Sequence, residues 1–127
     1  MDFQKYVGIE YCASNEFGNG LSCWELVELV MREQFRLTPP KVEFKGSSQE
    51  AKPVFIRELK NWQEVKSGQE KAGDLVLFNM LNIYSHCGIV VKEKTMLHVI
   101  ENRNATIERY DTHGWKNRII GFYRWLK

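Results

Sequence analysis

The second half of the chain limits the fold most, because it is a run of short apolar segments separated by turn-forming or charged residues. The segments are rich in Val, Ile, Leu and aromatic residues, which favour strands. They are Asp74 to Phe78, His86 to Val91, Thr95 to Ile100, Thr106 to Tyr110 and Ile119 to Arg124. The first half shows helical patterns instead. Helices followed by strands are typical of an α+β fold, with an antiparallel sheet and helices packed on one side.

The stretch from Gly18 to Phe35 predicts the principal helix of the chain. Ser22 is a favourable N-cap, and Glu25 three residues later can complete a capping box. Apolar residues then recur at helical offsets counted from Cys23, so the cysteine begins the face that the helix buries. A proline pair that starts at Pro39 ends the helix soon afterwards.

Other parts of the first half are less regular. Residues Phe3 to Tyr11 suit a short helix or an extended segment that caps the core. Residues Lys41 to Ala51 contain glycine and serine and predict a surface loop. Apolar residues then return at roughly helical spacing, which predicts a second amphipathic helix from about Pro53 to Glu64.

Length and composition predict one domain over residues 1–127, because a chain of this size buries a substantial core without metals or disulfides. Lys and Arg number 18 against 16 Asp and Glu, which leaves a formal net charge of +2, and the basic residues are scattered. That distribution argues against nucleic acid as a partner. Three cysteines cannot form a complete disulfide framework, and their spacings match no paired-cysteine zinc signature, so reduced thiols are expected.

The N-terminus has no basic run followed by an apolar core, so no signal peptide is expected. No apolar run approaches the length of a membrane span. We therefore expect synthesis in a cytoplasm, and some other route if the protein acts elsewhere.

The position of Cys23 in the first helical turn allows two interpretations. The unpaired amides and the dipole of a helix N-terminus favour an anion, which lowers the pKa of a thiol and makes it a better nucleophile. Alternatively, Cys23 is a small buried hydrophobe, since free cysteine is among the most buried residue types. Histidines elsewhere in the chain must decide between the two.

Two histidines, His86 and His98, lie in consecutive predicted strands. A two-residue hairpin between these strands would send the two side chains to opposite faces of the sheet. A loop of three or five residues would instead set His98 across from Gly88, with both imidazoles on one face within reach of a ring-to-ring hydrogen bond. A catalytic pair therefore requires an odd-length loop.

If the histidines share a face, they form with Cys23 a nucleophile, a base and an orienting group. His86 would take the thiol proton, and His98 would fix the tautomer of His86. The alternative is a pair of half-exposed strand histidines. A zinc site is a further alternative, but Cys87 must face away from its strand neighbour His86, which leaves at most three ligands. His113 lies in a loop and is expected to be solvated, and Cys87 is expected to be a packing residue.

Five blocks of the sequence resemble successive blocks of the NlpC/P60 cysteine peptidases. They are Tyr6 to Tyr11, Gly20 to Val27, Ala72 to Phe78, Ser85 to Val90 and Met96 to His98. Cysteine, histidine and histidine follow in that order, each in its expected block. The resemblance implies a papain-like α+β domain, in which N-terminal helices pack on a five- to six-stranded antiparallel sheet. It implies no metal and no other cofactor.

By this resemblance, Cys23 matches the nucleophile, His86 the base and His98 the third polar residue. Tyr11 matches the tyrosine that lies over the active site of the family. The amide of Cys23, at the helix start, is a physically sensible oxyanion donor. The neighbours expected on the substrate or oxyanion side are Ser22, Trp24 and Ser85.

The implied activity is hydrolysis of peptide bonds in the stem peptides of bacterial peptidoglycan, commonly after D-glutamate. The closing segment, Trp115 to Arg124, is similar to the end of a subgroup found in tail proteins of bacteriophages and prophages. This similarity implies a protein made in the bacterial cytoplasm and carried in a phage tail, with other tail-tip proteins as partners. The alternatives are a structural tail protein that keeps the fold without turnover, and an acyltransferase with the same nucleophile.

Two positions next to the nucleophile depart from the family pattern. The family usually has aspartate immediately before the cysteine and a small residue two positions after it, where this chain has Ser22 and Glu25. Serine caps a helix as well as aspartate does, so the fold should persist.

We predict that Cys23 is alkylated before Cys12 and Cys87 at mildly acidic pH, because Cys23 alone combines a helix N-terminus with a candidate histidine partner. Iodoacetamide labelling followed by peptide mass analysis measures the order. Equal labelling of the three cysteines in the folded protein would contradict the assignment of Cys23 as the nucleophile.

Overall fold

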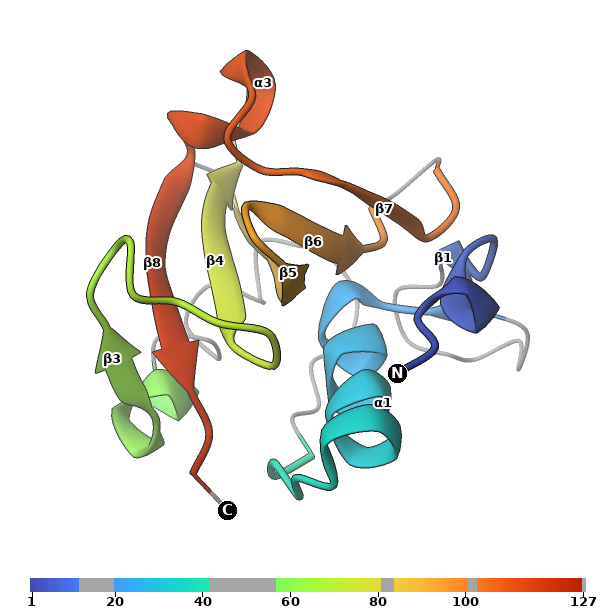
Figure 1. The fold of residues 1–127 in the computed structure, drawn as a ribbon, viewed down its shortest axis with the longest axis horizontal. Coiled ribbons are helices and arrows are strands. Elements are labelled where there is room, and N and C mark those ends of the chain that lie inside the picture. Colours follow the sequence, from blue (N-terminus) through green and yellow to red (C-terminus); the bar gives the residue numbers. More distant parts are fainter. Residues whose placement is uncertain (12–19, 42–56, 81–83, 101–102, 127) are drawn as a thin grey trace.

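The computed structural model describes residues 1–11, 20–41, 57–80, 84–100 and 103–126, and Figure 1 shows their arrangement. The helices with described bounds are η1 (Gln4–Tyr6), α1 (Cys23–Phe35), η3 (Leu59–Asn61) and α3 (His113–Lys116). The strands are β1 (Glu10–Tyr11), β2 (Gly20–Leu21), β3 (Gln63–Val65), β4 (Leu75–Met80), β5 (Tyr84–Lys92), β6 (Thr95–His98), β7 (Thr106–Arg109) and β8 (Ile119–Arg124). Within these ranges, no helix has the length and apolar character needed to cross a membrane.

Six strands form one antiparallel sheet in the order β3-β8-β4-β5-β6-β7, and α1 packs against β5. In Figure 1, β3 and β8 lie to the left and α1 lies to the right of the central strands. β1 and β2 form a separate parallel pair. All five strands predicted for the second half occur, and the predicted α+β fold is confirmed.

The predicted second helix is wrong at its C-terminal end. Its first residues, 53–56, lie outside the described residues, as does nearly all of the predicted loop from Lys41 to Ala51. Its final residues, Gln63 and Glu64, instead belong to β3, which ends at Val65 and pairs with β8. Val65 lies opposite Phe122 in this pairing and is buried in the same cluster. Cross-strand packing therefore outweighs the local helical spacing.

Helix α1 has the predicted bounds and the predicted N-terminal cap. The backbone N–H of Ser22 donates to the Glu25 carboxylate at 2.9 Å, and the backbone N–H of Glu25 donates to the Ser22 hydroxyl at 3.2 Å. The two residues that depart from the family pattern therefore cap the helix together. The helix ends at Phe35, after which Arg36 adopts a left-handed backbone conformation with φ of 55°.

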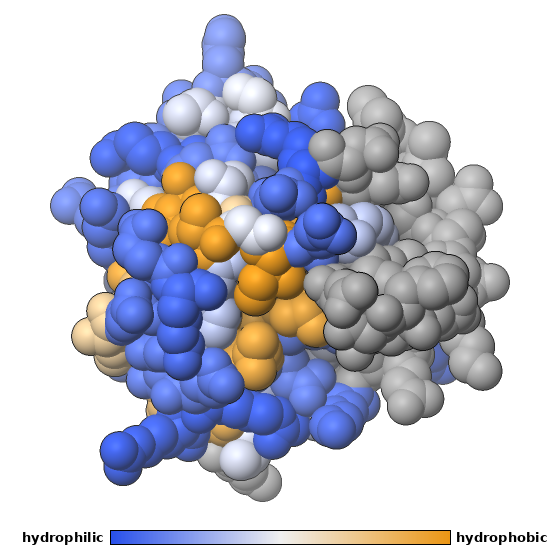
Figure 2. All heavy atoms as spheres, turned by 90° about the vertical axis from the view of Figure 1, so that its right-hand side faces the viewer, coloured by the Kyte–Doolittle hydropathy of each residue, from blue (hydrophilic) through white to orange (hydrophobic). Residues whose placement is uncertain are grey.

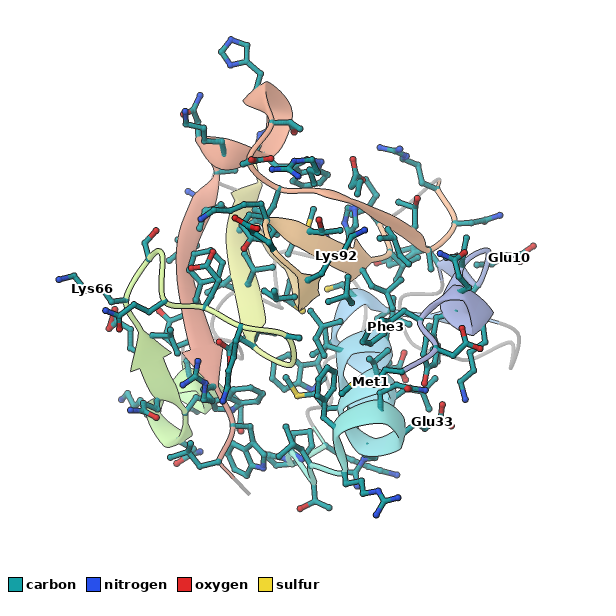
Figure 3. All side chains as sticks on the ribbon, in the orientation of Figure 1. Met1, Phe3, Glu10, Glu33, Lys66 and Lys92 are labelled. Atoms are coloured by element: carbon teal, nitrogen blue, oxygen red, sulfur yellow. The ribbon has the colours of Figure 1, made fainter. Side chains whose placement is uncertain are left out.

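The N-terminal segment packs along α1. The Tyr6 hydroxyl donates to the Glu33 carboxylate at 2.7 Å, and the Phe3 ring stacks on Phe35 with centroids 6.0 Å apart. Figure 3 shows Phe3 and Glu33 beside this helix. The segment predicted to be either helical or extended contains both forms, as η1 and β1.

Alternating side chains of the central strands build two apolar clusters, one on each face of the sheet. Helix α1 covers the first cluster, whose buried members include Leu26, Val27, Val30, Leu75, Leu77, Cys87, Ile89, Leu97 and Val99. The second cluster, on the other face, contains Val65, Val76, Phe78, Val90, Met96, Tyr110, Trp115 and Phe122. Figure 2 shows one side of the exterior, where the described surface is mostly hydrophilic and apolar side chains gather in a strip near the middle.

The hairpin between β5 and β6 combines a two-residue turn with an extra residue in β5. Lys92 pairs with Thr95 across the turn, but the next pair is Val90 with Met96, so Val91 forms a β-bulge. The expectation that a pair of histidines on one face requires an odd-length loop is therefore wrong. The bulge supplies the one-residue shift of register that an odd-length loop would have supplied.

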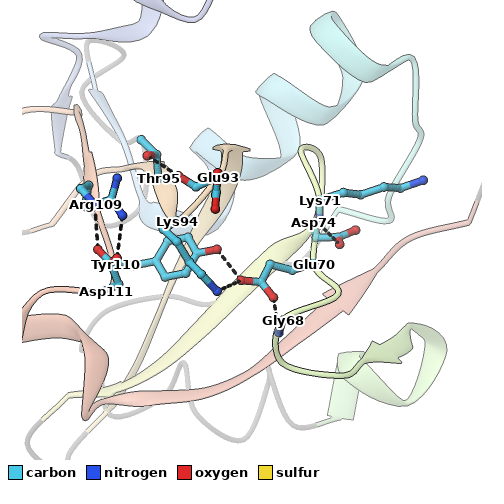
Figure 4. Close-up of polar contacts among 10 residues, drawn as sticks. All are labelled: Gly68, Glu70, Lys71, Asp74, Glu93, Lys94, Thr95, Arg109, Tyr110 and Asp111. Carbon is cyan, nitrogen blue, oxygen red and sulfur yellow. Dashed lines mark hydrogen bonds and ion pairs between the residues drawn. The ribbon is translucent and has the colours of Figure 1, made fainter.

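The carboxylate of Glu70 holds this turn against the loop that precedes β4, as Figure 4 shows. It accepts hydrogen bonds from the Tyr110 hydroxyl at 2.6 Å and from the Gly68 backbone N–H at 2.7 Å, and it lies 3.4 Å from the Lys94 ammonium. Burial and the hydrogen bond to Glu70 raise the pKa of Tyr110, so the hydroxyl stays a donor. These contacts fix the hairpin that carries His98.

We predict that Arg124→Met lowers the free energy of unfolding by about 3 kcal/mol, because it removes one partner of a buried ion pair. The Arg124 guanidinium donates to both carboxylate oxygens of Asp74 at 2.8 Å, and the Asp74 side chain is 2% exposed. Urea unfolding measures the loss. Arg109→Met is the matched control, because its pair with Asp111 is solvent-exposed and should contribute little. Equal losses in the two variants would contradict the prediction.

Candidate active site

His86 and His98 lie on the same face of the sheet and are joined ring to ring. The β-bulge in β5 sets a register that places His98 across from Gly88 and diagonal to His86. Nε2 of His86 is 2.9 Å from Nδ1 of His98, and both rings are buried. A Cβ added to Gly88 would lie 3.1 Å from the Cβ of His98, so glycine leaves the space that the pair needs.

Helix α1 packs against β5 and brings Cys23 next to His86 and Cys87 of that strand. Among the described residues, β6 pairs with β5 only between Ile89 and Lys92, so β6 does not cover the β5 edge at His86 and Cys87. Hydrogen bonding with Cys87 and His86 acts on the pKa of the Cys23 thiol.

These hydrogen bonds lower the pKa of the Cys23 thiol well below its ordinary value. The hydrogen bond with the Cys87 side chain is the largest cause, and the hydrogen bond and charge of His86 add to it, so that together they outweigh burial. Burial raises the pKa of the Cys87 thiol well above its ordinary value, and the neighbouring Cys23 raises it further. Cys23 is therefore the thiol that ionises, and Cys87 is the thiol that donates.

The hydrogen-bond chain continues past His98 to two residues that sequence reasoning missed. Nε2 of His98 is 2.6 Å from Oε2 of Glu108, and the Trp115 indole N–H donates to Oε1 of Glu108 at 3.2 Å. The hydrogen bond with His98 is the largest cause that lowers the pKa of Glu108. Burial is the largest cause that lowers the pKa of His98. The Trp115 ring also packs against both imidazoles, with centroids 4.9 Å from His98 and 5.8 Å from His86.

The sequence does contain a feature that could have indicated Glu108. A carboxylate inside a predicted strand, next to apolar residues, is expected to have a polar partner. Its partner depends on the β6–β7 register, in which His98 pairs with Thr106 and Met96 pairs with Glu108. That register sets Glu108 diagonal to His98 on the same face. Cys87 packs in the cluster under α1, as expected for a residue that faces away from His86, but its contact with Cys23 was not predicted.

Tyr11 and Ser22 lie close to Cys23 in the chain fold. Tyr11 pairs with Leu21 between β1 and β2, which sets it beside the residues that lead into α1, and it is half-buried against the cluster under that helix. Ser22 is buried, and its hydroxyl is engaged in the helix cap. Ser22 therefore shapes the start of α1, where the Cys23 amide lies.

The other predicted residues are placed differently. Trp24 is 1% exposed and packs edge-on against Trp62 with centroids 5.6 Å apart, so it is a core residue beyond the reach of a substrate. The side chain of Ser85 and all of Cys12 lie outside the described part of the chain. His113 begins α3 and is exposed. Over the described ranges, no group of three or more His, Cys, Asp or Glu side chains is arranged to hold a metal ion.

A cysteine at the start of a helix, in contact with a histidine on an antiparallel sheet, defines the papain-like α+β class. The chain belongs to the NlpC/P60 family, whose model matches residues 8–124. Members of this family are typically cysteine peptidases or amidases, and some members are inactive. No curated protein matches the chain.

Solved structures share this fold at low sequence identity. A protein similar to lipoprotein, of the NLP/P60 family, from Staphylococcus aureus subsp. aureus Mu50 has a TM-score of 0.68 and 20% identity over 97% of this chain and 38% of its own. An NlpC/P60 family protein from Bacillus cereus ATCC 10987 has a TM-score of 0.68 and 18% identity over 96% of this chain and 37% of its own. NlpC1 from Trichomonas vaginalis has a TM-score of 0.65 and 13% identity over 98% of this chain and 42% of its own. The chain thus spans about two fifths of each of these structures.

We predict that Cys87→Ala raises the pKa of Cys23, because the substitution removes the hydrogen bond that contributes most to lowering it. The rate of Cys23 alkylation, followed against pH, should then rise at a higher pH than in the wild type. Cys87→Ser is the matched control, since its hydroxyl is of similar size and can donate to the thiolate. An unchanged profile in Cys87→Ala would show that Cys87 does not stabilise the thiolate.

Proposed function

We propose that the chain is a cysteine endopeptidase that hydrolyses peptide bonds in the stem peptides of bacterial peptidoglycan. The supporting observation is the contact between Nε2 of His86 and Nδ1 of His98 at 2.9 Å, next to a thiol, Cys23, whose pKa Cys87 and His86 lower. In space, the thiol lies next to His86, and His86 lies next to His98. This is the arrangement of nucleophile, base and orienting group that acyl transfer requires. Membership of the NlpC/P60 family supports the substrate class.

The first half of the reaction forms an acyl-enzyme. Nδ1 of His86 accepts the thiol proton, and the sulfur of Cys23 attacks the carbonyl carbon of the scissile peptide bond. The carbonyl oxygen becomes an oxyanion, which the backbone N–H of Cys23 can stabilise at the positive end of the α1 dipole. His86 then gives its proton to the leaving amine, the C–N bond breaks, and a thioester remains on Cys23.

The second half releases the product. His86 takes a proton from water, and the hydroxide oxygen attacks the thioester carbonyl. The C–S bond breaks, the peptide leaves as a carboxylic acid, and the proton returns to the sulfur. The backbone N–H of Ser22 is already bound to Glu25, so we assign the oxyanion to the Cys23 amide rather than to the amide of Ser22.

We further propose that the protein acts as a component of a phage or prophage tail. The support is the resemblance of its closing segment, Trp115 to Arg124, to a tail-associated subgroup of the family. Two residues of this segment have structural roles, since Phe122 is buried in the core and Arg124 pairs with Asp74. Fractionation of induced phage particles, with detection of the chain in purified tails, is the direct test of this location.

We predict that the purified protein cleaves peptidoglycan muropeptides, and that Cys23→Ala and His86→Ala each lower the cleavage rate by about 100-fold or more, as loss of a nucleophile or general base does. Mass analysis of the fragments measures the rate and identifies the bond. His113→Ala is the matched control, because this histidine is exposed and should be dispensable. A folded wild type that cuts no muropeptide would favour the structural alternative.

A further inference from the structure

The carboxylate of Glu108 receives a donor on each of its two oxygens. Oε1 accepts from the Trp115 indole, a group that can only donate, and Oε2 lies 2.6 Å from Nε2 of His98. An ionised carboxylate has no proton to give, so Nε2 of His98 must carry the hydrogen of that contact. Glu108 thereby fixes one end of the hydrogen-bond chain that runs through the site.

The contact between Glu108 and His98 determines which atoms donate and which accept in the remaining hydrogen bonds of the site. His98 is 1% exposed, and burial disfavours a charged ring, so we take His98 as neutral with a single N–H, which the ring spectra below test. Because that hydrogen is on Nε2, Nδ1 of His98 is an acceptor. Nε2 of His86, 2.9 Å away, must then be a donor. A neutral His86 with its hydrogen on Nε2 has its lone pair on Nδ1, the nitrogen left for Cys23.

We infer that Glu108 is a positioning residue that fixes the tautomer of His98 and, through it, aims the lone pair of His86 at the Cys23 thiol. The same arrangement serves both states of the base. When His86 accepts the thiol proton on Nδ1, its Nε2–H still donates to His98, so no other hydrogen bond in the chain has to reverse. This inference concerns the proton-accepting state of His86, and its use in peptide hydrolysis rests on the proposed function.

The substitution Glu108→Gln keeps the shape of the side chain and creates a conflict of donors. If the amide oxygen faces His98, the amide NH₂ faces the Trp115 N–H, and two donors meet. If the NH₂ faces His98 instead, the hydrogen of His98 moves to Nδ1, and His86 is forced to carry its hydrogen on Nδ1, where it blocks the thiol proton. Trp115→Phe removes the indole donor, so a second substitution at this position should resolve the conflict.

Nitrogen-15 spectra of the histidine rings test the inference in the wild-type protein. We expect hydrogen on Nε2 of both His86 and His98, and an unprotonated Nδ1 in His98. A protonated Nδ1 in His98 would overturn the inference. This measurement needs neither a substrate nor a variant that folds.

The second experiment compares Glu108→Gln, Trp115→Phe and the double variant by the pH profile of Cys23 alkylation and by muropeptide cleavage. Cys87 and Arg103 are the other groups that titrate or carry charge near the hydrogen-bonded residues Glu108, His98, His86 and Cys23. We expect the alkylation midpoint to move to higher pH and cleavage to fall by about 100-fold in Glu108→Gln, since the contribution of the base is lost. Both should return in the double variant to the values of Trp115→Phe alone.

The outcomes separate the two proposals. A double variant no better than Glu108→Gln, with thermal midpoints showing that both are folded, would mean that Glu108 serves only to hold β7 and α3 together, and would overturn the inference. Absence of cleavage in the wild type would contradict the proposed function alone, because the alkylation profile and the ring spectra still test the role of Glu108 without any substrate.

Discussion

The pairing of β5 with β6 is the constraint on which the site depends. A slip of one residue in this hairpin would exchange every side chain of β6 between the two faces of the sheet. Leu97 would leave the cluster under α1, and His98 would enter it without a polar partner. The bulge at Val91 sets the register, and the contacts of Glu70 hold the turn against the loop before β4. The residue that contacts the His86 ring is thus decided by a structural detail remote from the thiol.

The two faces of the sheet differ in the side chains that they bury. The face under α1 is packed with aliphatic side chains and positions the helix that begins at Cys23. The opposite face holds buried histidines whose hydrogen bonds end at a partly exposed carboxylate, Glu108. Buried polar groups are tolerated when each has a partner, and an incomplete chain would cost more than an apolar core. The site therefore joins a thiol at the start of α1, which packs on one face of the sheet, to a pair of histidines on the other face.

Local sequence patterns predicted the elements and the residue types of the site, whereas its connections required tertiary information. Ser22 and Glu25 define the start of α1 by themselves, because a capping box is formed by residues three positions apart. His98 and Glu108 lie in consecutive strands, β6 and β7. The sequence between these strands gives no short-range pattern that predicts their register, so the contact could not be predicted. Cys87 was correctly expected to be a packing residue that faces away from His86, yet its proximity to Cys23 could not be foreseen, because strand alternation does not say where α1 packs on the sheet. β3 was missed because it has only three residues and a single apolar one, Val65, directly after a stretch with helical spacing.

The candidate site is divided unequally along the chain, with Cys23 near the beginning and His86, Cys87, His98, Glu108 and Trp115 all in the second half. A ribosome delivers the cysteine first, well before the residues that lower its pKa. Until β5 has formed and α1 has docked on it, the thiol lacks the hydrogen bonds that stabilise its ionised form. The ionised form of Cys23 therefore depends on the completed packing of α1 on β5, so the reactivity of this thiol reports whether the two halves of the chain have come together.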